Sequence, residues 1–255
     1  MYTLLICLLA GMGAGLGTGF AGMSAAAVIS PMLITFLNMP AYQAVGVALA
    51  SDVLASAASA FTYYRNKNLD VRNGLIMMAA VLAMTMVGSW ASSLMPNSTM
   101  GSFSTVMTLL LGVKFLVRPV MTTRQTMEGV SRARRAVQSI ISGALVGFIC
   151  GFVGAGGGMM MLLVLTSVLG YELKTAVGTS VFIMTFTAFT GAASHMVIGG
   201  APDLSALILC VIATLAGARG SALFANKAEP RTLNRITGVV LAALSAAMLI
   251  VKFLT

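Results

Sequence analysis

Charged side chains are scarce in this sequence, and acidic ones are scarcer than basic ones. Only 8% of the 255 residues are charged, six are Asp or Glu, and the mean hydropathy is +0.98. A soluble domain carries roughly 25% charged residues, so this composition excludes a soluble globular protein. The alternating ten-residue strands of a membrane β-barrel are also missing. Several apolar runs instead reach the roughly 20 residues of a membrane-crossing helix, and we predict an all-α, polytopic helical membrane bundle.

Histidine and cysteine are nearly absent as well. The chain has one histidine, His195, and three cysteines that lie in apolar runs without CxxC or Cys/His spacing. This pattern favours packing cysteines, and we expect neither a disulfide framework nor a metal site nor a cofactor. A membrane-embedded enzyme would need a clustered nucleophile, base or metal set. With a single histidine and no paired carboxylates in the apolar runs, we predict no catalytic residues and no enzyme.

The formal charge is +9, and most of the basic residues fall in three groups, within residues 65–72, 118–135 and 227–235. Each group lies at the end of an apolar run, where Lys and Arg keep a loop on the cytoplasmic side. We therefore interpret them as topology anchors, with anionic lipids or anionic substrates as further partners and no nucleic acid. The N-terminal apolar run lacks the basic start of a signal peptide, and we expect it to belong to the mature bundle.

The order of apolar runs indicates an internal repeat. We predict a first transmembrane repeat at residues 1–120, a basic cytoplasmic linker at 121–137 and a second transmembrane repeat at 138–255. Each repeat begins with a long apolar segment, about 3–37 and 138–169, and continues with three spans. The predicted spans are about residues 41–64, 72–94, 99–120, 172–198, 203–224 and 232–254.

The two halves align without a gap when Gly15 is placed on Gly147, and this shift is called the repeat offset below. Under it, Ala44-Val45-Gly46 falls on Ala176-Val177-Gly178. When the basic groups are all cytoplasmic, the loop near residues 65–72 is inside while its counterpart near residue 200 is outside. The two repeats are therefore predicted to have inverted topology.

The same orientation requires each long segment to begin and end on one side of the membrane. Residues 138–169 as one helix would be roughly 48 Å long, too long for a roughly 30 Å hydrocarbon core. We predict a Gly-rich hairpin that is broken at Gly154 to Gly158, and a similar break within residues 15–27. The sequence leaves open whether these hairpins are re-entrant or form two full short spans.

Broken helices inside a membrane expose backbone groups and helix N-termini, which favour an anion. Inverted repeats with breaks at matching positions indicate a secondary transporter with its substrate near the midplane. We interpret Gly147 and Gly151 as helix-packing residues and the contiguous run Gly156-Gly157-Gly158 as the break, and helix-to-helix hydrogen bonding is the alternative role of the hydroxyls. The candidate substrate-binding residues are Gly154, Gly156, Gly157, Gly158, Thr179, Ser180, Ser24 and Ser51.

Asp52 lies about eleven residues into its predicted span, where a charged side chain costs at least roughly 2.5 to 3.5 kcal/mol. It is a candidate for ion coupling, chiefly as a proton carrier, and a structural carboxyl between helices is the alternative. His195, near the external end of its span, is a second candidate because it can titrate near neutral pH.

Taken together, these motifs resemble the sulfite exporter TauE/SafE family of membrane permeases. The resemblance is carried by "GFICGFVGAGGGMMMLLVL" with "LKTAVGTSVF" in the second half, and by "GLGTGFAGMSAAAVISPML" with "AYQAVGVALASD" in the first. It implies a multi-pass transporter of the bacterial inner membrane for sulfite, sulfonates such as sulfoacetate, or carboxylates, coupled to an ion gradient. The first half departs from the family pattern, with Ser24-Ala25-Ala26 in place of a glycine run.

We therefore expect a small anion to be moved by alternating access of the two repeats, with proton coupling. An anion channel is the alternative, and a membrane-embedded enzyme is less favoured. The sequence leaves open the substrate, the direction of transport, the coupling ion and whether the protein forms a homo-oligomer.

Overall fold

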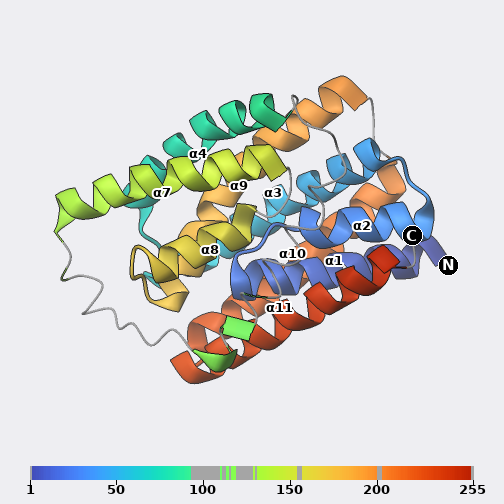
Figure 1. Cartoon of the computed structure of the whole chain (residues 1–255). Helices are drawn as coiled ribbons and strands as arrows, with labels where there is room; N and C mark the ends of the chain where they lie inside the picture. Colours follow the sequence, from blue (N-terminus) through green and yellow to red (C-terminus); the bar gives the residue numbers. More distant parts are fainter. Residues whose placement is uncertain are drawn as a thin grey trace.

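The structure, a computed structural model, is a bundle of helices that run roughly along one common direction (Figure 1). It describes residues 2–92, 131–153, 157–199 and 203–253, together with residues 110, 113–114, 116–118 and 129. Within these ranges every long regular element is helical, as predicted. The helices are α1 (Tyr2–Ala21), α2 (Ala26–Leu37), α3 (Ala41–Arg65), α4 (Val71–Ser92), α7 (Arg132–Val153), α8 (Gly157–Ser167), α9 (Leu173–Gly199), α10 (Leu204–Lys227) and α11 (Pro230–Phe253).

Both long apolar segments are broken, at the places where glycine and small residues cluster. The first is divided into α1 and α2, and the second into α7 and α8. The helices α2 and α8 have 12 and 11 residues, or roughly 18 and 16 Å, which is too short to cross a roughly 30 Å core. The shorter arms therefore enter the bundle without spanning it.

The second broken segment begins and ends at the same end of the bundle. The guanidinium carbon of Arg135, in the first turn of α7, lies 5.4 Å from the ring centroid of Tyr171, which follows α8. The two ends of the predicted hairpin segment, residues 138–169, therefore lie near each other. The helix α7 begins at Arg132, within the range 121–137 that we predicted as a linker. Arg and Ala favour a helix there, so residues 132–137 extend the apolar helix by about 1.7 turns.

The helix boundaries follow the repeat offset that aligned the sequence. Ala21 at the end of α1 aligns with Val153 at the end of α7, and Ala41 at the start of α3 aligns with Leu173 at the start of α9. The packing partners correspond too, because α1 packs along α10 and α7 packs along α4.

Glycine allows this close packing at matching positions of the two halves. A Cβ on Gly15 would overlap the Thr214 carbonyl oxygen, and one on Gly147 would overlap that of Val81. Backbone atoms of the neighbouring helix thus occupy the place that a side chain would need. Gly147 is therefore a helix-packing glycine.

Four of the described helices are long and apolar enough to cross a membrane: residues Tyr2–Ala21, Gln43–Arg65, Leu173–Ala193 and Leu204–Lys227. They correspond to α1, α3, α9 and α10, and support the prediction of a multi-pass membrane protein. The described apolar part of α4 is shorter, Val71–Val87. The span predicted at residues 99–120 lies largely outside the described residues.

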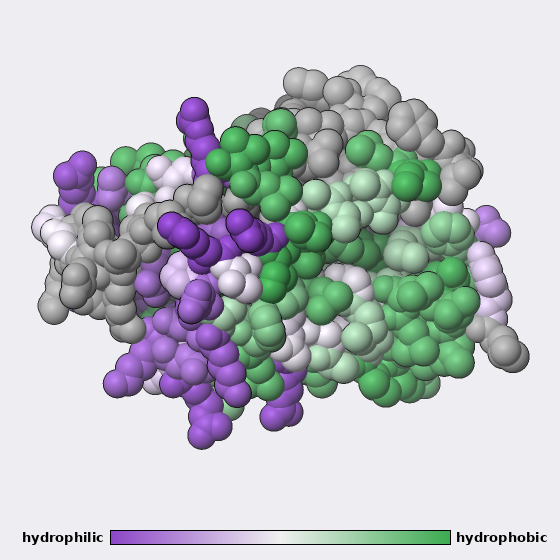
Figure 2. All heavy atoms as spheres, turned by 90° about the horizontal axis from the view of Figure 1, so that it is seen from below, coloured by the Kyte–Doolittle hydropathy of each residue, from purple (hydrophilic) through white to green (hydrophobic). Residues whose placement is uncertain are grey.

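Hydrophilic side chains gather at one end of the bundle, while apolar side chains cover much of the rest of the face seen in Figure 2. Contacts join the loops at this polar end. The Lys174 ammonium donates to the Asn226 carbonyl oxygen at 2.9 Å, and the Asn68 amide donates to the Asn226 side chain at 2.7 Å. The segments around Asn68, Lys174 and Asn226 therefore meet at this end of the bundle.

Gly147→Ala is expected to destabilise the protein by about 1 to 3 kcal/mol, because the added methyl group meets backbone of α4 that cannot turn aside. The matched control is Gly220→Ala on α10, where nothing lies within 4 Å of the added methyl group. Thermal unfolding in detergent should show a lower midpoint for the first variant only. Equal midpoints for the two variants would contradict the close packing of α7 on α4.

Candidate functional site

The end of α1 lies inside the bundle, where its last carbonyl groups need partners other than water. Gly22 follows the helix with a φ of 61°, a left-handed conformation that glycine adopts without strain. Side-chain hydroxyls from three other helices donate to the carbonyl oxygens around this break. They are Tyr63 of α3 to Gly19 at 2.8 Å, Thr237 of α11 to Phe20 at 3.2 Å, and Ser180 of α9 to Gly22 at 2.9 Å. Hydrogen bonds from three neighbouring helices therefore stabilise the break at the end of α1.

The two broken segments meet at this point. A Cβ on Gly158, at the start of α8, would lie 2.6 Å from the Gly22 carbonyl oxygen and 2.9 Å from the Ser24 backbone nitrogen. The Ser180 hydroxyl, which donates to Gly22, is also 3.4 Å from the Gly158 carbonyl oxygen. One side chain of α9 thus contacts the tips of both hairpins, and the glycine at position 158 lets them approach.

Asp52 lies beside the same break, near the middle of α3, and is fully buried. Ser24 donates its hydroxyl to Asp52 Oδ2 at 2.6 Å, and Ser56 donates to Oδ1 at 2.8 Å. The Ser24 hydroxyl oxygen in turn accepts the backbone N–H of Ala26 at 3.3 Å, in the first turn of α2. The carboxyl group is thereby linked to the first hairpin through one serine.

Two of the predicted residues do not join this cluster. The Ser51 hydroxyl donates to the Val47 carbonyl oxygen of its own helix at 2.8 Å. The Thr179 hydroxyl oxygen accepts the backbone N–H of Asp70 at 3.2 Å, toward the polar end of α9.

The remaining candidates lie at or beyond the edges of the described residues. Gly157 is the first residue of α8, and His195 lies within α9. The positions of Gly154 and Gly156, and the side chain of His195, lie outside the described residues.

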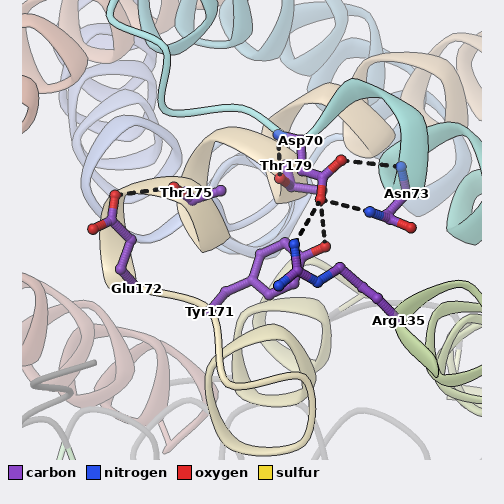
Figure 3. Close-up of polar contacts among 7 residues, drawn as sticks. All are labelled: Asp70, Asn73, Arg135, Tyr171, Glu172, Thr175 and Thr179. Atoms are coloured by element: carbon purple, nitrogen blue, oxygen red, sulfur yellow. Dashed lines mark hydrogen bonds and ion pairs between the residues drawn. The ribbon is translucent and has the colours of Figure 1, made fainter. Parts of the chain in front are cut away.

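A second polar cluster lies between the ends of the helices, at the polar end of the bundle (Figure 3). Its centre is the Asp70 carboxylate in the loop before α4. Oδ2 accepts the Tyr171 hydroxyl at 2.8 Å and the Asn73 amide at 2.7 Å, and Oδ1 accepts the Asn73 backbone N–H at 3.1 Å. The Arg135 guanidinium is 3.9 Å from Oδ2. Burial, and next the Asp70 carboxylate, raise the pKa of Tyr171, so its hydroxyl keeps the proton that it donates.

The sequence contained a signal for some of these partners but not for others. Ser56 follows Asp52 by four residues, which places both on one face of a helix. Asp70 and Tyr171 are 101 residues apart, and no local pattern connects them. Tyr63 is one of several aromatic residues near the end of α3, and nothing in the sequence distinguishes it as the one that contacts the break after α1.

The described residues hold no group of three or more His, Cys, Asp or Glu side chains that could bind a metal ion. Cys7 and Cys210 are buried, free thiols on neighbouring helices, with the Cys210 sulfur 3.9 Å from the Cys7 carbonyl oxygen. The chemistry that the described site offers is thus that of hydroxyl groups, backbone groups and one buried carboxyl group.

Comparison with known proteins identifies the family of the chain. The sequence model of the family described as sulfite exporter TauE/SafE matches residues 7–248. The chain is 27% identical over 240 residues to the probable membrane transporter protein YunE of Bacillus subtilis (strain 168), covering 89% of this chain and 88% of that protein. It is 23% identical over 212 residues to the probable membrane transporter protein YdhB of the same organism, covering 83% and 86%. The chain belongs to the sulfite exporter TauE/SafE family and is a multi-pass membrane transporter.

Proposed function

We propose that the protein is a secondary transporter that moves small organosulfur or organic anions by alternating access, coupled to protons. The substrates we propose are sulfite, a sulfonate such as sulfoacetate, or a carboxylate. The location that we propose is the bacterial inner membrane, since the resemblance in both halves of the chain is to permeases of that membrane.

The observation that carries this proposal is the meeting of two hairpin tips beside a buried carboxyl group. Gly158 packs against the backbone of Gly22 to Ser24, and Ser24 bonds directly to Asp52. Non-helical backbone at membrane depth is tolerated where it is buried in protein or lines a cavity. In secondary transporters built from inverted repeats, such interrupted helices form the substrate site.

The anionic substrate class follows from the groups available at the tips. The first turns of α2 and α8 begin at the two breaks, so their backbone N–H groups and helix dipoles favour negative charge there. Ser180 adds a hydroxyl that can turn from a carbonyl oxygen to a bound oxyanion. Gly154, Gly156 and Gly157 complete the proposed second tip, while Thr179 and Ser51 are proposed in supporting positions on α9 and α3.

The proposed coupling role of Asp52 rests on its burial and its partners. A fully buried carboxyl group in an apolar span is costly to ionise. Binding a proton there removes the charge and therefore most of that cost. Ser24 connects that change to the first hairpin tip through a 2.6 Å hydrogen bond. Protonation therefore alters a contact of the tip that the substrate is proposed to approach. His195 remains a second candidate for coupling.

The test is uptake of labelled sulfite, sulfoacetate and a simple carboxylate into proteoliposomes of the purified protein, with and without an imposed pH gradient. Saturable uptake of one of these anions that responds to the gradient is the expected result. Conduction without saturation or coupling would favour an anion channel. If none of the three anions moved under any gradient, the proposed substrate class would be wrong.

Asp52→Asn is expected to abolish the response to the pH gradient while counterflow of the same anion continues. The amide keeps the shape of the side chain and can still accept from one serine, but it does not bind and release a proton in the transport cycle. The matched control is Asp203→Asn, which alters an exposed carboxylate before α10. A gradient response that is equal in Asp52→Asn and the parent protein would remove Asp52 from the coupling mechanism.

Ser180→Ala is expected to slow transport of the accepted anion about tenfold, because the Gly22 carbonyl oxygen loses its hydrogen-bond donor. Thr185→Ala on the same helix is the control, since the Thr185 hydroxyl bonds to the Val181 carbonyl oxygen within α9. Initial uptake rates at saturating substrate distinguish the two variants. Equal rates in both would mean that the Ser180 contact does not contribute to transport.

A further inference from the structure

We propose that Asp70, together with Tyr171 and Arg135, forms the cytoplasmic gate of the transport path, and that this end opens when Asp70 separates from them. The proposal rests on the alternating-access function proposed above. It adds a positioning residue, Asp70, at a place distinct from the hairpin tips.

The three side chains come from three separate segments of the chain (Figure 3). Asp70 lies in the loop between α3 and α4, Arg135 in the first turn of α7, and Tyr171 in the turn between α8 and α9. Asp70 thus belongs to the first half of the chain, and both of its partners belong to the second hairpin and its flanks. Any motion that separates the first half from the second hairpin at this end must break the 2.8 Å bond between Tyr171 and Asp70.

Along α9, the residue that contacts the Asp70 loop is directly followed by the residue that contacts the hairpin tips. Thr179 accepts the backbone N–H of Asp70, and the next residue, Ser180, donates to the Gly22 carbonyl oxygen. Asn68, in the same loop as Asp70, presents its carbonyl oxygen directly against Gly178, where a Cβ would overlap it. The loop that holds Asn68 and Asp70 therefore packs directly against the first turns of α9. These turns lie between the polar end of the bundle and the hairpin tips.

At the opposite end, an Asp also precedes a helix, and the contacts described for it are with its own helix. Asp203 precedes α10 as Asp70 precedes α4, and its Oδ1 accepts the N–H of Ser205 at 2.9 Å and of Ala206 at 3.3 Å. It is exposed, whereas the Asp70 side chain has a relative exposure of 17%.

The partners of Asp70 also lack counterparts in the first half of the chain. Under the repeat offset, Tyr171 aligns with Met39 and Arg135 aligns with Thr3. Neither Met39 nor Thr3 is aromatic or charged. Among the described residues, this set of polar contacts therefore occurs at one end.

Asp70 also begins α4, and this structural role must be separated from gating. Its Oδ1 accepts the Asn73 backbone N–H, as an N-cap does, whereas Oδ2 faces Tyr171 and Arg135. Asn is as good an N-cap as Asp, so Asp70→Asn keeps the helix start but removes the charge. Tyr171→Phe leaves Asp70 untouched, keeps the ring beside Arg135 and removes only the donated hydroxyl.

The experiment measures access to a reporter cysteine in Val177→Cys, made in a background of Cys7→Ala, Cys150→Ala and Cys210→Ala. Val177 is fully buried on α9, and its carbonyl oxygen would be 3.2 Å from a Cβ on Gly22. A membrane-impermeant methanethiosulfonate is applied to inside-out vesicles without substrate. Asp70→Asn is expected to raise the labelling rate about tenfold, the effect of losing one charge-assisted hydrogen bond, and Tyr171→Phe to raise it less.

Asp203→Asn is the matched control, and it should leave the labelling rate unchanged. Parent-like labelling in both Asp70→Asn and Tyr171→Phe would overturn the proposal. So would an equal rise in Asp203→Asn, which would indicate general loosening, or a rise seen only when the reagent is applied to the external face. Monodisperse elution in detergent establishes that each variant is folded, and Tyr171→Phe alone carries the test if Asp70→Asn does not fold.

The labelling result is independent of which anion the protein carries. Faster labelling in Asp70→Asn, with no transport of sulfite, sulfoacetate or carboxylate, would support the gate and remove the proposed substrates. Gradient-driven uptake by the parent protein, with unchanged labelling in the variants, would support the proposed function and remove the gate.

Discussion

The rest of the structure depends on one constraint: a helix that ends inside an apolar bundle leaves carbonyl groups that water cannot reach. At the end of α1 this requirement is met by hydroxyls from α3, α9 and α11. Those bonds fix where α1 stops and bring α9 against the tip of the first hairpin. The second hairpin can then approach closely at Gly158, because glycine has no side chain to separate its backbone from that of the first hairpin tip.

The two halves of the chain have corresponding helices but carry different polar residues at the candidate site. Under the repeat offset, Asp52 aligns with Met184, and Ser180 aligns with Ala48. The buried acid therefore occurs only in the first half, and the hydroxyl that contacts both tips occurs only in the second. A repeat with identical residues would present two equivalent sets of groups, whereas here the acid and the hydroxyl each come from one half only.

The sequence was sufficient for the features that repeat or that are costly. Glycine runs, apolar lengths and the repeat offset predicted the broken helices, and α3 and α9 begin at corresponding residues. Asp52 was identifiable because a carboxyl group in an apolar run is expensive. The Asp70 cluster was not predictable, since its members come from segments as much as 101 residues apart and each looks like an ordinary loop or helix-end residue. Only the folded arrangement shows that Thr179 faces that cluster while Ser180 faces the tips.

The arrangement of α3 and α9 provides a physical link between the carboxyl group at the centre and the polar end. These helices pack against each other, and α3 carries Asp52 at its middle and continues directly into the loop that holds Asp70. On α9, the contacts to that loop and to the tips are made by consecutive residues, so a shift of the helix cannot change one without changing the other. Coupling between distant sites requires an element that both sites bias. In this structure the hairpin tips and the loop that holds Asp70 contact consecutive residues of one turn of α9, Thr179 and Ser180, through direct hydrogen bonds.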